Sequence, residues 1–117
     1  MKRAALALAF ATLALGCSSD DDHEHAIDTS GTDSILALTG DASAGETLYS
    51  NNCSSCHATD GSGGIGPSLI DGIPGLSDAE VAGAIRNGIE DNMPSYEASL
   101  TEQEIADLVA YLVGTFG

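Results

Sequence analysis

Two cysteines and a histidine lie close together near the middle of this 117-residue chain, in the run Cys53-Ser54-Ser55-Cys56-His57. A spacing of three positions lets both thiols reach the two vinyl groups on one edge of a single porphyrin. The histidine that follows is then held beneath the ring, where it can bind the iron. This run is the attachment signature of a c-type haem. It predicts one covalently bound, iron-containing haem c, with Cys53 and Cys56 as attachment points and His57 as a ligand.

Other sites also use closely spaced cysteines. A structural zinc ion usually takes four ligands, often from two separated pairs, whereas this chain has one pair and His57. The remaining candidates lie in a polar stretch: Cys17, His23 and His25. A thioredoxin-like redox pair follows a strand in a β-α-β pattern, and no apolar strand precedes Cys53. A zinc site, a redox dithiol and a chance match therefore remain as alternatives to haem attachment.

Met93 is the candidate for a second iron ligand, because it is the one methionine apart from Met1. Pro94 follows it and stiffens the loop by fixing its own φ angle. A thioether favours reduced iron and raises the potential of a haem that also has a histidine ligand. Met93 could instead fill a gap in the core, but a methionine in a polar loop beside a proline makes poor core filler. His23 and His25 are weaker alternative ligands.

Function depends on this second ligand. With His57 and Met93 both bound, the iron has no vacant position, which favours single-electron transfer over catalysis. We therefore expect an electron carrier between larger redox proteins, with no enzymatic activity and no small-molecule substrate. The alternative is a haem-based enzyme or ligand sensor, peroxidase-like or gas-binding, in which the Met93 ligand is labile.

The start of the chain has the pattern of a targeting segment. Lys2 and Arg3 precede an apolar stretch, Ala4–Leu15, that is too short to span a bilayer but suits a signal peptide. The stretch leads into Gly16 and Cys17, which resembles a bacterial lipobox. We expect residues 1–16 to be removed and Cys17 to carry lipid, although ordinary cleavage nearby would leave it as a free thiol. The expected location is the bacterial cell envelope, lipid-anchored and facing the periplasm.

Residues 17–39 are expected to form an acidic, mostly disordered linker, because so polar a segment buries too little apolar surface to offset the entropy of ordering. Leu36 and Leu38, with Ile35, are apolar enough to dock on the domain as a short extended piece. The net charge of the chain is −15, and after removal of the signal peptide Arg86 is the only basic residue. This charge excludes nucleic acid as a partner and favours redox proteins with a basic docking patch.

The pattern of residues 40–117 predicts an all-α domain with three main helices. The last helix begins with a capping box at Thr101-Glu102-Gln103-Glu104 and is expected to stop at Gly114. The middle helix begins with a second capping box at Ser77-Asp78-Ala79-Glu80 and should end at Gly88.

The first helix is expected to start near Asp41 or Ser43 and to run into the cysteine motif. Gly45 lowers its helix propensity, which indicates that another backbone approaches closely there. The stretch Thr59–Gly75 is rich in glycine, serine and proline and is expected to be a loop over one haem edge.

The domain as a whole resembles the class I cytochromes c, and it looks most similar to short bacterial forms and to haem domains attached to some terminal oxidases. The resemblance rests on Gly40-Asp41, Gly45, Leu48-Tyr49, Cys53 to His57, Gly61, Gly63, Gly66-Pro67-Ser68-Leu69, Ile85-Arg86-Asn87-Gly88 and Met93-Pro94. It implies the cytochrome c fold, with the first and last helices crossing near Gly45 and Tyr111. It also implies that the Pro67 carbonyl accepts a hydrogen bond from the His57 ring, which would orient the ring. Ala58 stands where glycine is common in the family.

Overall fold

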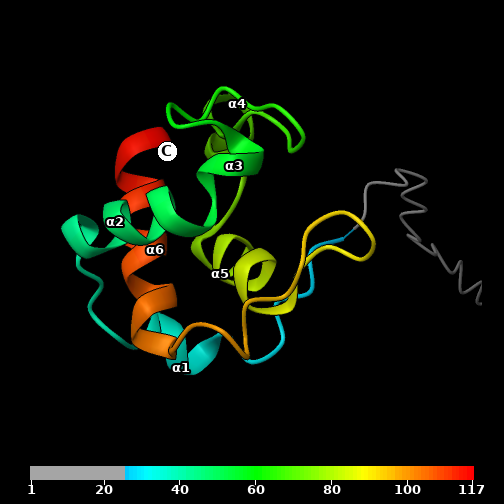
Figure 1. Ribbon diagram of the computed structural model, residues 1–117. Helices are drawn as coiled ribbons and strands as arrows, with labels where there is room; N and C mark the ends of the chain where they lie inside the picture. Colours follow the sequence, from blue (N-terminus) through cyan, green and yellow to red (C-terminus); the bar gives the residue numbers. More distant parts are fainter. Residues whose placement is uncertain (1–25) are drawn as a thin grey trace, which may run out of the picture.

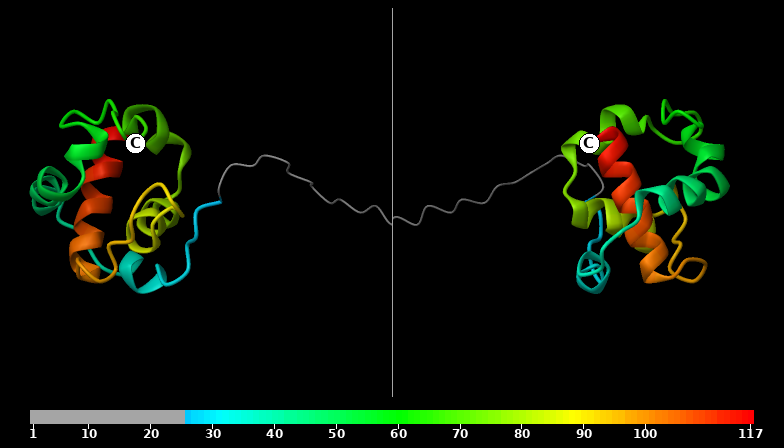
Figure 2. Two further views of the ribbon diagram at one scale, coloured as in Figure 1. Left: turned by 45° about the vertical axis from the view of Figure 1, so that its right-hand side comes forward. Right: turned by 90° about the vertical axis from the view of Figure 1, so that its left-hand side faces the viewer.

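The computed structural model describes residues 26–117, and within this range the chain is helical and contains no strand, which confirms the predicted all-α class (Figure 1). The elements are α1 (Asp33–Leu36), α2 (Ala42–Asn52), α3 (Ser54–His57), α4 (Leu69–Gly72), the 3₁₀ turn η1 (Ile73–Gly75), α5 (Asp78–Asn87) and α6 (Glu102–Phe116). None of the helices in this range has the length and apolar character needed to cross a membrane. In both views of Figure 2, α6 lies between α2 and α5.

Both predicted capping boxes are present. The Glu80 backbone amide donates to Ser77 Oγ at 3.1 Å, and the Ser77 amide donates to Glu80 Oε1 at 2.9 Å. Thr101 and Glu104 form the same reciprocal pair at the start of α6. Each box satisfies two amide groups that have no partner inside the helix. Local hydrogen bonding therefore determines where α5 and α6 begin.

The two helix ends differ in how well they were predicted. Gly88 ends α5 as expected, with a φ of 75° that favours glycine. The expected stop of α6 at Gly114 is wrong, because the helix continues to Phe116. The Phe116 ring packs against Tyr49 and Tyr111, with ring centroids 6.4 and 6.2 Å apart. These contacts stabilise the last turn and outweigh the low helix propensity of one glycine.

The helices α2 and α6 cross where the resemblance implied. A Cβ atom at Gly45 would collide with the Asp107 carbonyl and with Cβ of Tyr111. Asp41 caps α2, and its own amide donates to Asp107 Oδ1 at 2.8 Å. The crossing is therefore held by close backbone contact and by the buried carboxylate of Asp107, which accepts a hydrogen bond from the start of α2.

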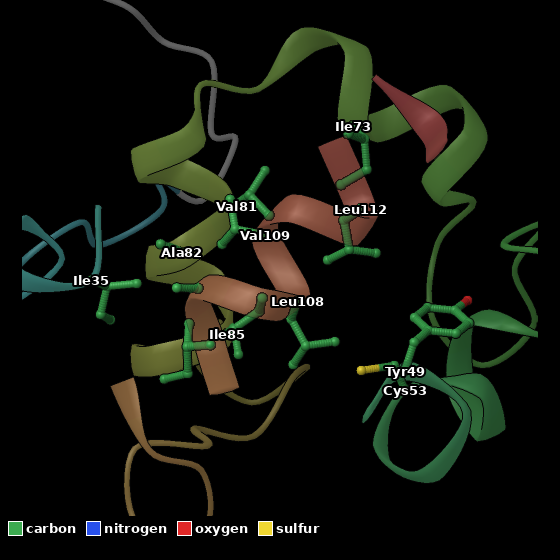
Figure 3. Close-up of a cluster of buried hydrophobic side chains, with 12 residues drawn as sticks. Ile35, Tyr49, Cys53, Ile73, Val81, Ala82, Ile85, Leu108, Val109 and Leu112 are labelled. Carbon is green, nitrogen blue, oxygen red and sulfur yellow. The ribbon is translucent and has the colours of Figure 1, made fainter. Parts of the chain in front are cut away.

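The core cluster joins buried side chains of α2, α5 and α6 with one residue each from α1 and η1 (Figure 3). Its largest fully buried side chains are Ile35, Tyr49, Ile105 and Leu108. Cys53 belongs to the same cluster of buried residues. The core therefore extends directly to the cysteine motif.

The segment expected to be a disordered linker is ordered where the structure describes it. Residues 26–39 pack on the helices, and Ile35 is 1% exposed. The expected extended piece is instead the helical turn α1, and Leu36 and Leu38 remain about 40% exposed. The burial of one isoleucine against distant helices is a tertiary contact that local composition does not reveal. The predicted signal peptide, together with Cys17, His23 and His25, lies outside the described residues.

The stretch expected to be a loop is only partly one. Residues 59–68 lack regular structure, but α4 and η1 follow directly. Ser68 caps α4 by accepting from the Asp71 amide at 3.3 Å, and Pro74 lies in the first turn of η1. Proline is well tolerated in the first turn of a helix, so a proline there did not exclude helical structure.

Candidate haem site

The two cysteines of the motif lie at the junction of α2 and α3. Cys53 ends α2 and begins α3, and its carbonyl accepts from the amides of Cys56 at 3.2 Å and His57 at 3.0 Å. The turn thus keeps the two thiols within one short helical segment. Cys53 is buried, Cys56 is half-buried, and both thiols are free. In Figure 3 the Cys53 sulfur points away from α2, toward the side of the core formed by α5 and α6.

The environment of Cys53 does not favour a redox dithiol. Burial raises the pKa of the Cys53 thiol to about 11, with a smaller contribution from Cys56. Reactive cysteines in Cys-X-X-Cys motifs have lowered pKa values instead. Among residues 26–117, no three histidine, cysteine or acidic side chains gather where they could hold a metal ion.

His57 ends α3 with a buried ring. Its Nδ1 atom lies 2.9 Å from the Pro67 carbonyl oxygen. A carbonyl can only accept, so Nδ1 is the donor, and in the neutral ring Nε2 then has a free lone pair. The hydrogen bond implied by the resemblance is therefore present, and it leaves the ring in the tautomer that binds a metal through Nε2.

The loop that carries Pro67 is held tightly against His57. The Gly66 amide donates to the Cys56 carbonyl at 2.8 Å, and the Gly63 amide donates to the His57 carbonyl at 2.9 Å. A Cβ atom at Gly66 would lie 2.8 Å from Cε1 of the His57 ring. The Gly-rich sequence is needed here because backbone and ring approach more closely than any side chain would allow.

Ala58, directly after His57, has the strained backbone angles φ 70° and ψ 159°. Glycine adopts this region readily, whereas other residues pay about 1–3 kcal/mol. The Tyr49 hydroxyl donates to the Ala58 carbonyl at 2.6 Å. Burial raises the pKa of Tyr49 to about 12, so the hydroxyl keeps its proton at neutral pH. Tyr49 therefore helps to hold the strained peptide next to the histidine.

Met93 lies in the loop between α5 and α6. Its amide and carbonyl both pair with Ile89, at 3.1 and 2.9 Å. A Cβ atom at Gly88 would lie 2.6 Å from the Met93 carbonyl oxygen. The Met93 side chain is half-buried and packs against the edge of the core. Its neighbourhood is thus more apolar than the polar loop sequence indicated.

Tyr96 joins the Met93 loop to the cysteine motif, a role that the sequence interpretation missed. Its hydroxyl donates to the Asn52 carbonyl at 3.0 Å, one residue before Cys53. Its amide donates to the Ile85 carbonyl at 2.9 Å. Burial raises the pKa of Tyr96, and the nearby thiols of Cys53 and Cys56 add to the rise. An aromatic residue in an otherwise polar loop was the available signal.

These groups fit a covalently attached haem. Two thiols lie on one turn, and the imidazole beside them has a free Nε2 atom. The thioether of Met93 comes from a separate loop, and Tyr96 holds that loop at the end of α2. A soft sulfur donor and an imidazole are a known ligand pair for haem iron.

Comparison with known proteins identifies the family. The family of cytochrome c oxidase, cbb3-type, subunit III matches residues 40–112, which is most of the chain. The chain is a class I c-type cytochrome. The cytochrome carries a single covalently bound haem c with iron and acts in electron transfer, not as an enzyme.

Matches to known proteins cover different shares of this cytochrome. It is 37% identical to a cytochrome c-553-like protein of Synechocystis sp. over 78 residues, which cover 67% of this chain and 72% of that one. It is 33% identical over 106 residues to CcoP, a cbb3-type cytochrome c oxidase subunit of Cereibacter sphaeroides. This match covers 80% of this chain but only 33% of CcoP. Cytochrome c6 of the diatom Phaeodactylum tricornutum is a structural neighbour with 29% identity and a TM-score of 0.54, covering 64% of this chain and 93% of that one.

Proposed function

We propose that this cytochrome is a lipid-anchored electron carrier of the bacterial envelope. In this proposal Cys53 and Cys56 would hold the haem through thioether bonds, and His57 and Met93 would be the ligands of its iron. The observation that carries the proposal is the hydrogen bond between His57 Nδ1 and the Pro67 carbonyl, because it leaves Nε2 free for a metal. Cys17 carries the lipid.

The chain holds the histidine side of the haem rigidly. Pro67 fixes the orientation of the ring and raises its basicity by accepting a hydrogen bond from Nδ1–H. The loop around Gly63 and Gly66 closes against the same residue through backbone hydrogen bonds. Bound haem supplies one-electron exchange at its iron. A rigid protein ligand keeps the cost of rearrangement low when the charge on the iron changes.

Occupation of the second side by Met93 explains why the protein transfers electrons without binding a substrate. The loop of Met93 is fixed by its pairing with Ile89 and by the Tyr96 hydroxyl. With both residues bound to the iron, oxygen or peroxide would find no vacant position. A neutral thioether also favours the reduced state and raises the potential.

The strongly acidic surface supports a partner with a basic docking patch. The chain has a net charge of −15, and beyond Arg3 its only lysine or arginine is Arg86. Complementary charge speeds the encounter of two redox proteins and orients them. Similarity to a subunit of a cbb3-type oxidase supports a larger redox protein as the partner.

Expression in a host with haem-attachment machinery tests the haem and its ligands. We expect a haem that stays with the chain on a denaturing gel, and a ferric spectrum with the weak far-red band of methionine-bound iron. Substituting serine for both Cys53 and Cys56 should abolish covalent attachment. A high-spin ferric spectrum without the far-red band would contradict Met93 as a ligand and favour a catalytic or gas-binding haem.

A separate experiment tests the anchor. The wild type should fractionate with membranes and carry the mass of a lipid on its mature N-terminus. The Cys17→Ala variant should keep its haem but appear in the soluble periplasmic fraction. A wild type that is soluble and without lipid would contradict the anchor and leave the haem assignment intact.

A further inference from the structure

Residues 26–32, here called the strap, lie along α5 ahead of the first helical turn. The carbonyl of Asp28 lies so close to Gly83 that a Cβ atom there would collide with it. Asn87 Nδ2 donates to the carbonyls of Asp28 at 2.8 Å and Ser30 at 2.9 Å. The strap is thus docked on α5 through its backbone, mainly at the helix end that precedes Met93.

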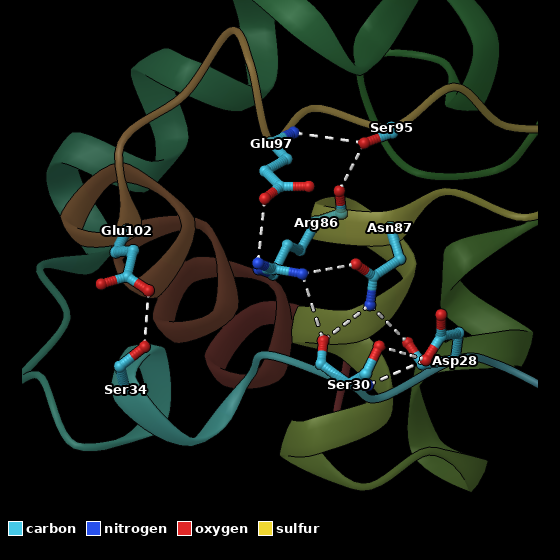
Figure 4. A network of polar contacts seen from close by, with 8 residues as sticks. All are labelled: Asp28, Ser30, Ser34, Arg86, Asn87, Ser95, Glu97 and Glu102. Atoms are coloured by element: carbon cyan, nitrogen blue, oxygen red, sulfur yellow. Dashed lines mark hydrogen bonds and ion pairs between the residues drawn. The ribbon is translucent and has the colours of Figure 1, made fainter.

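The guanidinium of Arg86 contacts the strap and the Met93 loop at the same time (Figure 4). Its Nη1 atom donates to the Ser30 carbonyl at 3.3 Å, and Nη2 donates to Glu97 Oε1 at 2.9 Å. Nη1 also donates to Asn87 Oδ1 at 2.8 Å. Gly31 packs directly against the guanidinium, and a Cβ atom there would force the arginine side chain to shift.

The same end of α5 holds the backbone of the loop, here defined as residues 89–97 and called the ligand loop. Ser95 Oγ donates to the Arg86 carbonyl at 2.6 Å and accepts from the Glu97 amide at 3.3 Å. One residue of α5 therefore contacts the strap on one side and the segment just after Met93 on the other.

We propose that Arg86 is a positioning residue for the Met93 ligand, and that it couples docking of the strap to closure of the ligand loop. This inference rests on the proposed function, since it assumes that Met93 binds the iron. The planar, fork-shaped guanidinium is suited to the role because a rigid plane holds its two NH₂ groups toward separate acceptors, whereas the three donors of an ammonium share one nitrogen at the end of a flexible stem. Such coupling is reciprocal: opening of the ligand loop changes the docking equilibrium of the strap by the same factor by which release of the strap changes the closing equilibrium of the loop.

In the first test, imidazole displaces Met93 from the ferric iron. The loss of the far-red absorption band measures how much methionine has been displaced. In Arg86→Gln and in Glu97→Gln, the imidazole concentration that displaces half of the methionine should fall about two- to fivefold, the range that corresponds to one partly exposed ion pair. Glu46→Gln is the matched control, since it removes the same charge from an exposed site on α2 that lies outside this network. Equal imidazole sensitivity in the wild type and the Arg86→Gln variant would overturn the proposal.

The second test measures the same coupling at the strap, after Met93 has been displaced from the iron. Hydrogen exchange of the strap peptide is compared between the wild type alone and the wild type with imidazole bound in place of Met93. We expect faster exchange at Ser30 and Thr32, whose amides have acceptors within the strap, when Met93 is displaced. In Arg86→Lys this dependence on the iron ligand should disappear, because the lysine keeps the charge but loses the fork.

The outcomes separate the inference from the proposed function. If wild-type ferric protein lacks the methionine band, Met93 ligation is wrong and the inference fails with it. If the band is present but strap exchange does not respond to loss of Met93, the coupling is wrong while the haem ligands stand. Unfolding of each variant in urea, measured in parallel, detects any general loss of stability.

Discussion

The ring of His57 donates a hydrogen bond from Nδ1 to the Pro67 carbonyl at 2.9 Å, and Gly66 lies directly against the same ring. The residue that supplies the proposed iron ligand is thus oriented by a loop that follows it closely in sequence. This arrangement makes the histidine side of the site sensitive to small changes in that loop.

Substitution of Gly66 should disturb the histidine directly. In Gly66→Ala the new Cβ atom would lie 2.8 Å from Cε1 and 3.0 Å from Nδ1 of His57. We expect a shifted reduction potential and a loss of about 1–3 kcal/mol in unfolding free energy, as for other overpacked sites. Gly72→Ala is the control, because no atom lies within 4 Å of its Cβ position. An unchanged potential in Gly66→Ala would show that the ring is not tightly held.

Ala58→Gly should stabilise the protein. Ala58 has a φ of 70°, which glycine adopts without strain. After allowing for the greater flexibility of glycine in the unfolded chain, we expect a gain of about 1 kcal/mol in urea unfolding. The same change at Ala44, inside α2, should instead cost about 1 kcal/mol. If both variants lose stability alike, the strain at Ala58 is absent.

The hydroxyl of Tyr49 should contribute stability that depends on pH. Its pKa is raised from 10.0 to about 12 by burial. The unfolded chain therefore loses this proton first, so the contribution is complete below pH 10 and is lost as the pH rises toward 12. Tyr49→Phe should cost about 1–2 kcal/mol at neutral pH, through loss of the hydrogen bond to Ala58. Its unfolding midpoint should also fall less steeply than that of the wild type above pH 10.

Two helical glycines, Gly45 in α2 and Gly114 in α6, should respond in opposite ways to alanine. Gly45→Ala places a methyl group against the Asp107 carbonyl and should cost about 1–3 kcal/mol or prevent folding. Gly114→Ala, in the last turns of α6, meets no neighbouring atom and should add up to about 1 kcal/mol through helix propensity. Thermal unfolding of the two haem-loaded variants measures both effects, and a stable Gly45→Ala variant would contradict the close crossing.

Features determined by neighbouring residues could be predicted from the sequence. The capping boxes of Ser77 and Thr101 place α5 and α6 because their hydrogen bonds involve residues three positions apart. Gly45 indicated a close approach because glycine is unfavourable inside a helix and needs a reason to be there. The cysteine motif and Met93 were recognised from residue chemistry and spacing.

Features determined by distant contacts could not be predicted in this way. The helix α6 passes through Gly114 because Phe116 packs on Tyr49, far away in the sequence. The turn around Ile35 is ordered because its side chain is buried among helices that follow it. The bridge from Arg86 to the strap and the ligand loop joins segments about 56 and 11 residues away, so nothing in the local sequence reveals it.

The absorption spectrum of the purified protein in both oxidation states tests the central claim most directly. We expect the bands of a covalently attached haem c, with the weak far-red band of methionine-bound iron in the ferric state and its loss in Met93→Ala. A colourless protein from a host that attaches haem to other cytochromes, or a ferric spectrum that Met93→Ala leaves unchanged, would contradict it.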